Sequence, residues 1–266
     1  MKKVLFIGLG HMGSSLVKGV LSDKNHLIDV YGFDAIKEVQ EKVISDIPEL
    51  KSLKDLKEIE IRNIDVIVIG TRPIDVDPLC ENLDELDLKN KVIVCMANAV
   101  TIDRLRNKFK NNKDISLIRM MPNMNASIQM SVTALATQNA TKEHLKLVSD
   151  LFSLCGIVEL VDEEKFGTLT AISGCLPAYS FTFLKGIVDY AVQNGFEKEQ
   201  AYRIVETAII GSIKNATNSK IDLRKMIDQI CVPNGSTIEG QKVLDENKFE
   251  EILKKCLDAA NKKATN

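Results

Sequence analysis

Three glycines near the start of the chain have the spacing of a phosphate-binding turn. Gly8, Gly10 and Gly13 follow the pattern G-x-G-x-x-G, after the apolar run Val4–Ile7 and before residues 14–21, which favour a helix. In such a turn the first glycine permits a tight bend, the second lets a pyrophosphate approach the backbone, and the third lets the helix pack on the strand. The helix N-terminus then offers free N–H groups to the phosphates. The pattern predicts a dinucleotide site made of Gly8, Leu9, Gly10, His11, Met12 and Gly13. The alternative is a turn that only packs well.

An acidic residue follows the second predicted strand, 26–33. Asp34 stands about twenty residues after the glycines, where a carboxylate can accept hydrogen bonds from the adenosine ribose of a dinucleotide. The same carboxylate would repel the 2′-phosphate of NADPH, so it favours NADH. Asp is also a common N-cap, and Asp34 could cap a helix over 35–45. The two interpretations are compatible.

The composition excludes several classes of partner. A net charge of −2 without a basic block argues against nucleic acid. No apolar run approaches the ~20 residues of a membrane span, and the start has no signal-peptide pattern, so we expect a cytoplasmic protein without a membrane partner. The cysteines and histidines lack ligand spacing, which indicates reduced thiols and no metal site. These residues are Cys80, Cys95, Cys155, Cys175, Cys231, Cys256, His11, His26 and His144.

Strand and helix patterns alternate up to about residue 161. After the segments above, a polar helix is expected at 54–60, a helix that runs through Leu83, one that begins at Ile102, and one that Thr141 caps and that ends at Leu154. Further strands are expected at 65–70, 91–96, 115–121, 131–137 and 157–161. This alternation predicts a Rossmann-type, doubly wound α/β sheet.

Beyond Glu163 the strand patterns disappear. Helices are expected at 166–192, 198–216, 223–231 and 248–262. We therefore predict a dinucleotide-binding domain at 1–162 and an all-helical domain at 163–266. A domain of that size has limited capacity to bury long apolar helices alone, so a second subunit is expected to cover them.

Four segments, taken in order, resemble the pyrroline-5-carboxylate reductase family. They are Ile7–Gly13, Arg119-Met-Met-Pro-Asn123, Thr170-Ala-Ile-Ser-Gly-Cys-Leu-Pro-Ala-Tyr179 and Asp228-Gln-Ile-Cys-Val-Pro-Asn-Gly-Ser-Thr-Ile-Glu239. The resemblance implies reduction of 1-pyrroline-5-carboxylate to L-proline by hydride transfer from NADH or NADPH, the last step of proline biosynthesis. It also implies a homodimer or larger homo-oligomer, with the pocket between the nucleotide domain of one chain and helices of the dimer.

The resemblance assigns a role to each matching position. The family's cofactor loops correspond to Gly8–Gly13, Thr71, Arg72, Pro73, Asn98 and Ala99. The segments that shape its imino-acid pocket correspond to Ser173, Gly174, Cys175, Asn234, Gly235, Ser236 and Thr237. Thr237 matches a threonine that hydrogen-bonds the ring nitrogen, which makes it the catalytic candidate.

The residues themselves fit such a pocket. A turn at 233–237 that opens a helix at 238–244 would direct N–H groups toward a carboxylate, although an ordinary helix cap explains the same residues. No histidine is placed for proton transfer. A cyclic imine can react as the protonated iminium, so its reductase needs no side-chain acid.

Several positions depart from the family pattern and leave the substrate open. Val232 replaces a serine, Asn234 a glycine, Leu176 a small residue, Asn125 a proline, Ser131 a glycine, Arg72 a lysine and Lys185 an acidic residue. One alternative is a reductase of a related cyclic imino acid, such as the six-membered homologue. Another is a β-hydroxyacid-type dehydrogenase with Lys185 as its catalytic lysine. A third is a nucleotide-binding regulator without turnover.

Overall fold

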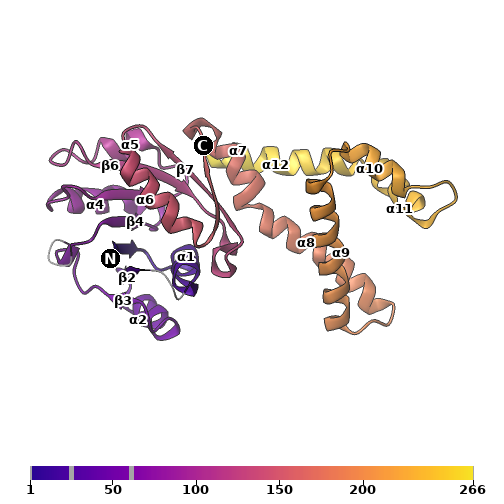
Figure 1. Cartoon of the computed structure of the whole chain (residues 1–266), viewed down its shortest axis with the longest axis horizontal. Helices are drawn as coiled ribbons and strands as arrows, with labels where there is room; N and C mark the ends of the chain where they lie inside the picture. The colour runs from indigo at the N-terminus through magenta and orange to yellow at the C-terminus, as the bar shows by residue number, and fades with distance from the viewer. Residues whose placement is uncertain (1, 24–26, 60–62, 266) are drawn as a thin grey trace. The chain divides into compact units, whose positions relative to one another are not determined.

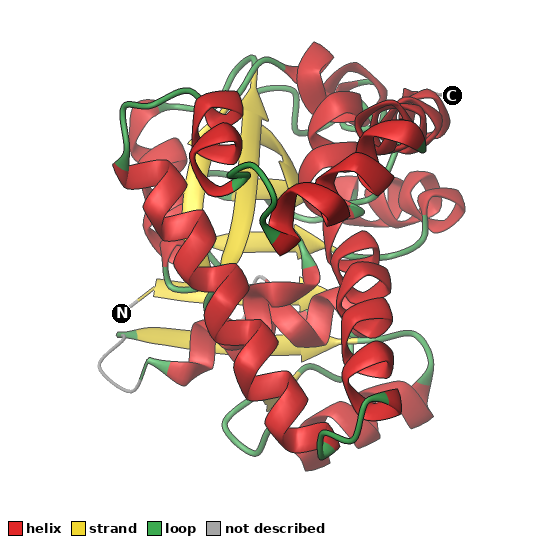
Figure 2. Cartoon of the chain, turned by 90° about the vertical axis from the view of Figure 1, so that its right-hand side faces the viewer, coloured by secondary structure: helices red, strands yellow, loops and turns green. Residues whose placement is uncertain are grey.

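One eight-stranded sheet organises the first part of the chain. The computed structural model describes residues 2–23, 27–59 and 63–265. Its strands are drawn as arrows in Figure 1 and in yellow in Figure 2. They lie in the order β3-β2-β1-β4-β5-β6-β7-β8, and all neighbours are parallel except β6 and β7. The order from β3 to β6 is that of doubly wound dinucleotide-binding sheets. The predicted α/β class is therefore confirmed.

The strands are short and most are followed by a helix. The strands are β1 (Lys2–Ile7), β2 (Ile28–Phe33), β3 (Lys51–Ser52), β4 (Val66–Ile69), β5 (Val92–Cys95), β6 (Ser116–Met121), β7 (Ser131–Thr137) and β8 (Gly156–Leu160). The helices among them are α1 (His11–Ser22), α2 (Lys37–Asp46), α4 (Pro73–Asp84), α5 (Ile102–Arg106), α6 (Lys142–Ser153) and the 3₁₀ turn η1 (Met124–Ile128).

The central strands are buried on both faces. In β1, Val4 and Phe6 pack with α1, α2 and α6 on one face, while Leu5 and Ile7 pack with α4 and α5 on the other. All four side chains are almost fully buried. A continuous apolar run is what a strand covered by helices on both faces requires, so the sequence pattern has this physical origin.

Helices alone follow β8. They are the 3₁₀ turn η2 (Glu163–Lys165), α7 (Phe166–Leu169), the π-helical turn η3 (Thr170–Gly174), α8 (Leu176–Gln193), α9 (Lys198–Asn218), α10 (Leu223–Ile230), α11 (Ser236–Glu246) and α12 (Phe249–Thr265). Contacts divide the chain into one unit of Met1–Pro177 with Ala260–Asn266 and a second unit of Ala178–Ala259. The domain boundary after residue 162 stays a prediction.

Most of the expected elements are found with shifted ends. Thr141 caps α6 as expected, because its hydroxyl accepts a hydrogen bond from the His144 N–H at 3.1 Å. The second strand begins at Ile28, and His26 lies outside the described residues. Most of the polar helix expected at 54–60 is not helical: residues 54–57 form a bend and a turn, only 58 and 59 are helical, and residue 60 is also outside the described residues. The helix expected over 166–192 contains the π turn η3, which residue periodicity does not predict.

One helical stretch bears on the expected absence of a membrane span. Among the described residues, the helical stretch Glu163–Gln193 is long and apolar enough to cross a membrane by length and composition, and 22% of its most apolar window is buried within the chain. Hydroxyl residues such as Thr170 and Ser173 interrupt the apolar run without adding charge. A count of consecutive apolar residues therefore misses it, whereas an average hydropathy does not.

Candidate active site

The three glycines of the loop after β1 have different surroundings. Gly8 has φ +95°, and a Cβ there would lie 2.7 Å from the carbonyl carbon of Gly70. A Cβ on Gly13 would lie 2.1 Å from the Gly8 carbonyl oxygen. Both glycines are therefore required by the backbone and its packing. A Cβ on Gly10 would meet no atom within 4 Å, so this position opens onto free space.

The N-terminus of α1 faces that space without a cap. Its N-cap residue, Gly10, is extended and has no side chain, and the first turn contains no acidic residue. The backbone N–H of Ser14 is bonded to the Gly10 carbonyl at 2.9 Å, but the N–H groups before it have no intrahelical acceptor. Bare backbone, free donors and the positive end of the helix dipole together suit a pyrophosphate.

The Asp34 carboxylate contacts the glycine loop. Its Oδ2 accepts a hydrogen bond from the Leu9 N–H at 2.7 Å, and its Oδ1 accepts one from the Ile36 N–H at 2.9 Å. Asp34 does not cap α2, because the N-cap of this helix is Ile36. The expected capping role is therefore wrong. Each carboxylate oxygen has two lone pairs, so the half-buried Asp34 retains acceptor capacity for a ribose hydroxyl.

The loop after β4 contributes an unpartnered hydroxyl. Thr71 Oγ1 is the one buried side-chain nitrogen or oxygen without a hydrogen-bond partner among the described residues. Thr71 lies beside the glycine loop, since a Cβ on Gly8 would come within 2.9 Å of its backbone nitrogen. The exposed Arg72 instead donates to Asp75 at 2.8 and 3.3 Å, and this hydrogen bond raises the pKa of its guanidinium. Pro73 begins α4.

Sheet topology brings the predicted cofactor loops to one edge. The parallel strands β1, β4 and β5 are neighbours, so the segments that follow them, with Gly8–Gly13, Thr71–Pro73 and Asn98–Ala99, lie at the same carboxyl edge. This is the point where the strand order reverses, at which doubly wound folds bind ligands. Asn98 and Ala99 are exposed, and Ala99 has φ +57°. An alanine in the left-handed region is strained, as is common at functional sites.

The first of the two predicted substrate segments lies at the π turn. The Asn123 Nδ2 donates to the Ser173 Oγ at 3.2 Å, which joins the loop after β6 to η3. A Cβ on Gly174 would lie 3.8 Å from the Met121 sulfur. The Cys175 N–H donates to the Thr170 carbonyl at 2.8 Å, the spacing of a π turn. Such turns are frequent at functional sites.

The other predicted segment belongs to the second unit. Asn234 has φ +61°, and Gly235 is the N-cap of α11, with no side-chain cap. The exposed residues Ser236 and Thr237 begin the helix, so the alternative that their hydroxyls serve as its cap is wrong. The free N–H groups of the first turn and two hydroxyls are thus available to a ligand.

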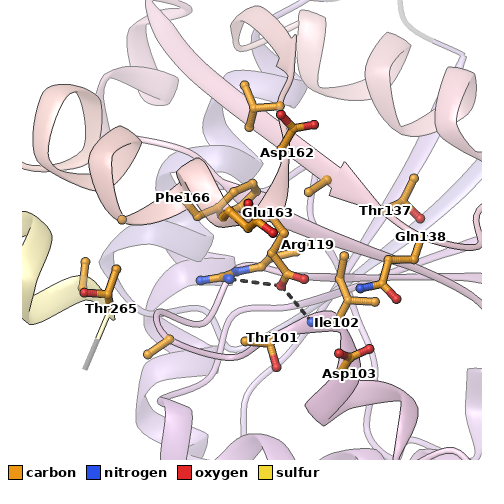
Figure 3. A pocket seen from close by; sticks show the side chains of 16 residues that line it. Thr101, Ile102, Asp103, Arg119, Thr137, Gln138, Asp162, Glu163, Phe166 and Thr265 are labelled. Atoms are coloured by element: carbon orange, nitrogen blue, oxygen red, sulfur yellow. Dashed lines mark hydrogen bonds and ion pairs between the residues drawn. The ribbon is translucent and has the colours of Figure 1, made fainter.

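A pocket of about 700 Å³ was missed by sequence reasoning (Figure 3). Arg119, 7% exposed, donates to the Glu163 Oε1 at 3.0 Å and stacks on the Phe166 ring at 4.6 Å. The same Glu163 oxygen accepts the Ile102 N–H at 2.9 Å (Figure 3). A single arginine in the mostly apolar strand β6 is a signal that predicts a buried partner for its charge, although it does not identify Glu163 as that partner. Of the predicted site residues, only Ala99 lines the pocket.

Known proteins resemble the chain over its whole length. A family model described as pyrroline-5-carboxylate reductase dimerisation matches residues 163–266, and one described as NADP oxidoreductase, coenzyme F420-dependent, matches residues 3–99. The pyrroline-5-carboxylate reductase of Escherichia coli is 30% identical over 98% of this chain and 98% of its own length. That of Aquifex aeolicus is 28% identical, over 98% and 96%. The chain belongs to the pyrroline-5-carboxylate reductase family.

Solved structures of the family have the same fold. Pyrroline carboxylate reductase from Plasmodium falciparum, crystallised with NADP bound, aligns with a TM-score of 0.89 at 25% identity, over 99% of this chain and 97% of that one. The 1-pyrroline-5-carboxylate reductase of Streptococcus pyogenes aligns with a TM-score of 0.87 at 29% identity, over 99% and 98%. The α/β sheet followed by a helical dimerisation region is therefore the arrangement of this family.

The dimerisation region explains the exposed apolar side chains of the second unit. Phe181, Phe183, Ile204 and Ile213 are each about half exposed in the single chain. Contiguous exposed apolar surface marks a protein interface. A pyrroline-5-carboxylate reductase dimerisation region supplies a partner chain for these helices, so the apolar stretch Glu163–Gln193 needs no membrane.

Two of the departures from the family pattern now have a structural account. Asn234 keeps the left-handed backbone, and asparagine is among the residues that tolerate this conformation when glycine is absent. Ser131 places its hydroxyl against the Asn123 backbone, where it accepts the Asn123 N–H at 3.2 Å. The structure offers no explanation for Val232 or Leu176.

Lys185 does not resemble a catalytic lysine. Its ammonium is exposed and pairs with Asp189 one turn later in α8, and this contact raises its pKa. A lysine used in proton transfer at neutral pH needs the opposite shift. The family assignment and this geometry both speak against a β-hydroxyacid-type dehydrogenase.

Proposed function

We propose that this chain reduces 1-pyrroline-5-carboxylate to L-proline with NADH or NADPH. The main support for the proposal is full-length similarity to pyrroline-5-carboxylate reductases. The open space at Gly10, where the strand order of the sheet reverses, is consistent with it. The proposal includes the domain boundary after residue 162, which is supported by the start of the dimerisation match at 163.

The cofactor is proposed to lie along the carboxyl edge of β1, β4 and β5. Gly10 and the free N–H groups of α1 hold the pyrophosphate, and Thr71 Oγ1 gains the hydrogen-bond partner that it lacks. When bound, the nicotinamide supplies the hydride. The chain orients the cofactor and excludes water from its reactive face.

The residues proposed to contact the imino acid are Ser173–Cys175 and Asn234–Thr237. The first turn of α11 provides N–H groups for its carboxylate, and the Thr237 hydroxyl accepts a hydrogen bond from the iminium N–H. The imine carbon accepts the hydride, and the C=N π electrons become the nitrogen lone pair. The nitrogen keeps its proton throughout, so no acid side chain is required.

NADH is proposed as the preferred cofactor. Asp34 follows β2, and its carboxylate is held at the glycine loop by the Leu9 N–H. Two like charges ~4 Å apart near a protein surface repel by about 4 kcal/mol, which corresponds to several-hundredfold in affinity. The 2′-phosphate of NADPH would meet this repulsion, whereas the ribose hydroxyls of NADH can donate to Asp34. Arg72 does not offset it, because Asp75 already engages its guanidinium.

The proposal also includes the oligomeric state of the protein and its location in the cell. The dimerisation match supports a homo-oligomer in which each imino-acid pocket is completed by helices of the dimer. We further propose a cytoplasmic location. Each of the six cysteines is a free thiol, as is usual in a reducing compartment.

A steady-state assay tests the function. Purified protein is given pyrroline carboxylate or its six-membered homologue, each with NADH and with NADPH. We expect turnover with the five-membered ring and higher kcat/KM with NADH. A higher kcat/KM with the six-membered ring would reassign the substrate. Absence of turnover with both rings would refute the reductase.

A further inference from the structure

A buried hydrogen bond fixes the role of one hydroxyl in the proposed substrate segment. Asn123 and Ser173 are 5% and 6% exposed, and the Asn123 amide lies 3.2 Å from the Ser173 Oγ. A hydroxyl can either donate to an amide oxygen or accept from an amide nitrogen. The orientation of the Asn123 amide therefore decides which way the Ser173 proton is directed.

The backbone determines that orientation. The other end of the Asn123 amide lies 3.1 Å from the Asn125 backbone N–H. A backbone N–H can only donate, so the amide oxygen must face it. The amide NH₂ then faces Ser173, whose oxygen accepts. The rest of Asn123 is also fixed, because its N–H donates to the Ser131 hydroxyl at 3.2 Å on β7.

The Ser173 proton has no acceptor in the described part of the chain. Other helical hydroxyls donate to the carbonyl four residues earlier: Thr170 to Phe166 at 2.7 Å, Thr182 to Ala178 at 3.1 Å and Ser212 to Ala208 at 2.8 Å. Ser173 forms no such bond; it lies in the π turn, where the Cys175 N–H donates five residues back to the Thr170 carbonyl. A buried hydroxyl donor without an acceptor is costly, so an acceptor from outside the chain would be stabilised at this position.

We propose that Asn123 is a positioning residue that holds the Ser173 hydroxyl as an acceptor, so that its O–H donates to the carboxylate of the bound imino acid. This inference rests on the proposed function. The protonated iminium nitrogen has no lone pair, so the carboxylate is the only strong acceptor on the substrate. The Asn125 N–H, the Asn123 amide and Ser173 then form one directed chain of donors that ends at the ligand.

The test exchanges donor for acceptor at one atom. Asn123→Asp keeps the shape and the bond to the Asn125 N–H but leaves Ser173 facing a carboxylate, toward which the serine proton turns. We expect KM for pyrroline carboxylate to rise by about ten- to a hundredfold, the loss typical of one hydrogen bond to a charged group, while KM for the nicotinamide cofactor stays unchanged. Ser173→Ala should raise KM similarly, and Asn123→Asp should add little in that background.

Two control variants distinguish the loss of the Ser173 hydrogen bond from the effect of an added charge and from a loss of stability. Gln129→Glu adds the same charge at an exposed residue just after η1, and KM should not change. Thr133→Val removes a buried hydroxyl 3.5 Å from the Ser131 Oγ and should lower the melting temperature without changing KM.

Different results would overturn the positioning role of Asn123 and the proposed function. Wild-type KM in Asn123→Asp, a rise in cofactor KM instead, or additive effects of Asn123→Asp and Ser173→Ala would each overturn the positioning role. Wild-type protein without reductase turnover would overturn the proposed function first. If Asn123→Asp does not fold, the competitive inhibition constant of L-proline is measured for Ser173→Ala and for the wild type. A constant equal to that of the wild type overturns the proposal, and a higher constant supports it.

Discussion

The carboxylate of Asp34 accepts a hydrogen bond from the Leu9 backbone N–H at 2.7 Å, across the end of β2 and the glycine loop. One carboxylate therefore has two tasks in the proposed enzyme. It fixes the loop that holds the pyrophosphate, and it faces the adenosine ribose. A substitution that removes the whole carboxylate disturbs both, so charge and loop geometry must be changed separately.

Asp34→Asn separates them. The amide oxygen can still accept the Leu9 N–H, while the negative charge and the bond from the Ile36 N–H are lost. We expect the ratio of kcat/KM for NADH to that for NADPH to fall by roughly ten- to several-hundredfold. Asp34→Ser should shift the ratio in the same direction and also weaken both cofactors, because the shorter side chain cannot reach Leu9. Wild-type protein that already prefers NADPH would show that Asp34 does not contact the ribose.

The glycine loop gives a paired prediction. Gly10→Val places methyl groups in the open space of the cradle, so binding of both cofactors should be lost while the melting temperature stays near wild type. Gly13→Ala should instead destabilise the fold, because its Cβ would lie 2.1 Å from the Gly8 carbonyl oxygen. Calorimetric titration and thermal unfolding of both variants check this. If Gly10→Val retains cofactor affinity, the glycine loop does not bind the pyrophosphate and only packs against the sheet.

Local patterns in the sequence were sufficient for the glycine loop and for every strand of the sheet except the two-residue edge strand β3. The strand at Val66–Ile69 is recognisable because burial on both faces demands apolar residues without alternation. Gly8 and Gly13 are identifiable for a related reason, since a fixed spacing within one turn meets a requirement of the backbone itself. Information of this kind lies within a few neighbouring residues.

Contacts between distant residues could not be predicted in the same way. Asn123 and Ser173 are fifty positions apart, and Arg119 and Glu163 are forty-four apart. Neither pair has a periodic pattern, so only the folded chain shows which polar groups meet. The π turn at Thr170–Gly174 is equally hidden, because its residues continue a helical pattern and the altered hydrogen bond changes no residue type.

The kinetics of a Thr237 variant test the proposed imino-acid pocket. Thr237→Ala removes the hydroxyl proposed to contact the iminium N–H, so KM for the imino acid should rise and kcat should fall, together about ten- to a hundredfold in kcat/KM. Cofactor affinity should be unchanged. Thr217→Ala is the matched control, because that hydroxyl donates to the Ile213 carbonyl of its own helix at 3.0 Å. Equal kinetics for the two variants would remove Thr237 from the site.

The ion pair in the pocket near α5 should behave as a coupled unit. Glu163→Leu leaves the buried Arg119 without its carboxylate and Ile102 without an acceptor, which should lower the free energy of unfolding by about 3–5 kcal/mol. Arg119→Met combined with Glu163→Leu removes both charges and should be less destabilised than the sum of the two single variants. Urea unfolding of all four proteins measures the coupling. Additive losses would show that the pair is not coupled.

Buried thiols should make the fold sensitive to alkaline pH. Burial raises the pKa of Cys155 to about 12. Below about pH 9 the thiol is protonated in both the folded and the unfolded chain, so it contributes no pH dependence. Between about pH 9 and 12 the unfolded chain loses this proton while the folded chain keeps it, so the free energy of unfolding falls by up to about 1.4 kcal/mol per pH unit.

Cys155→Ala tests this linkage. The variant should be less stable at pH 7, because the buried sulfur packs closely on Gly19 in α1. Above pH 9, however, its free energy of unfolding should decline less steeply than that of the wild type, and the two curves should converge. Urea unfolding at one fixed protein concentration, from pH 7 to 10.5, measures both slopes. Parallel curves above pH 9 would show that the Cys155 thiol is not held protonated by the fold.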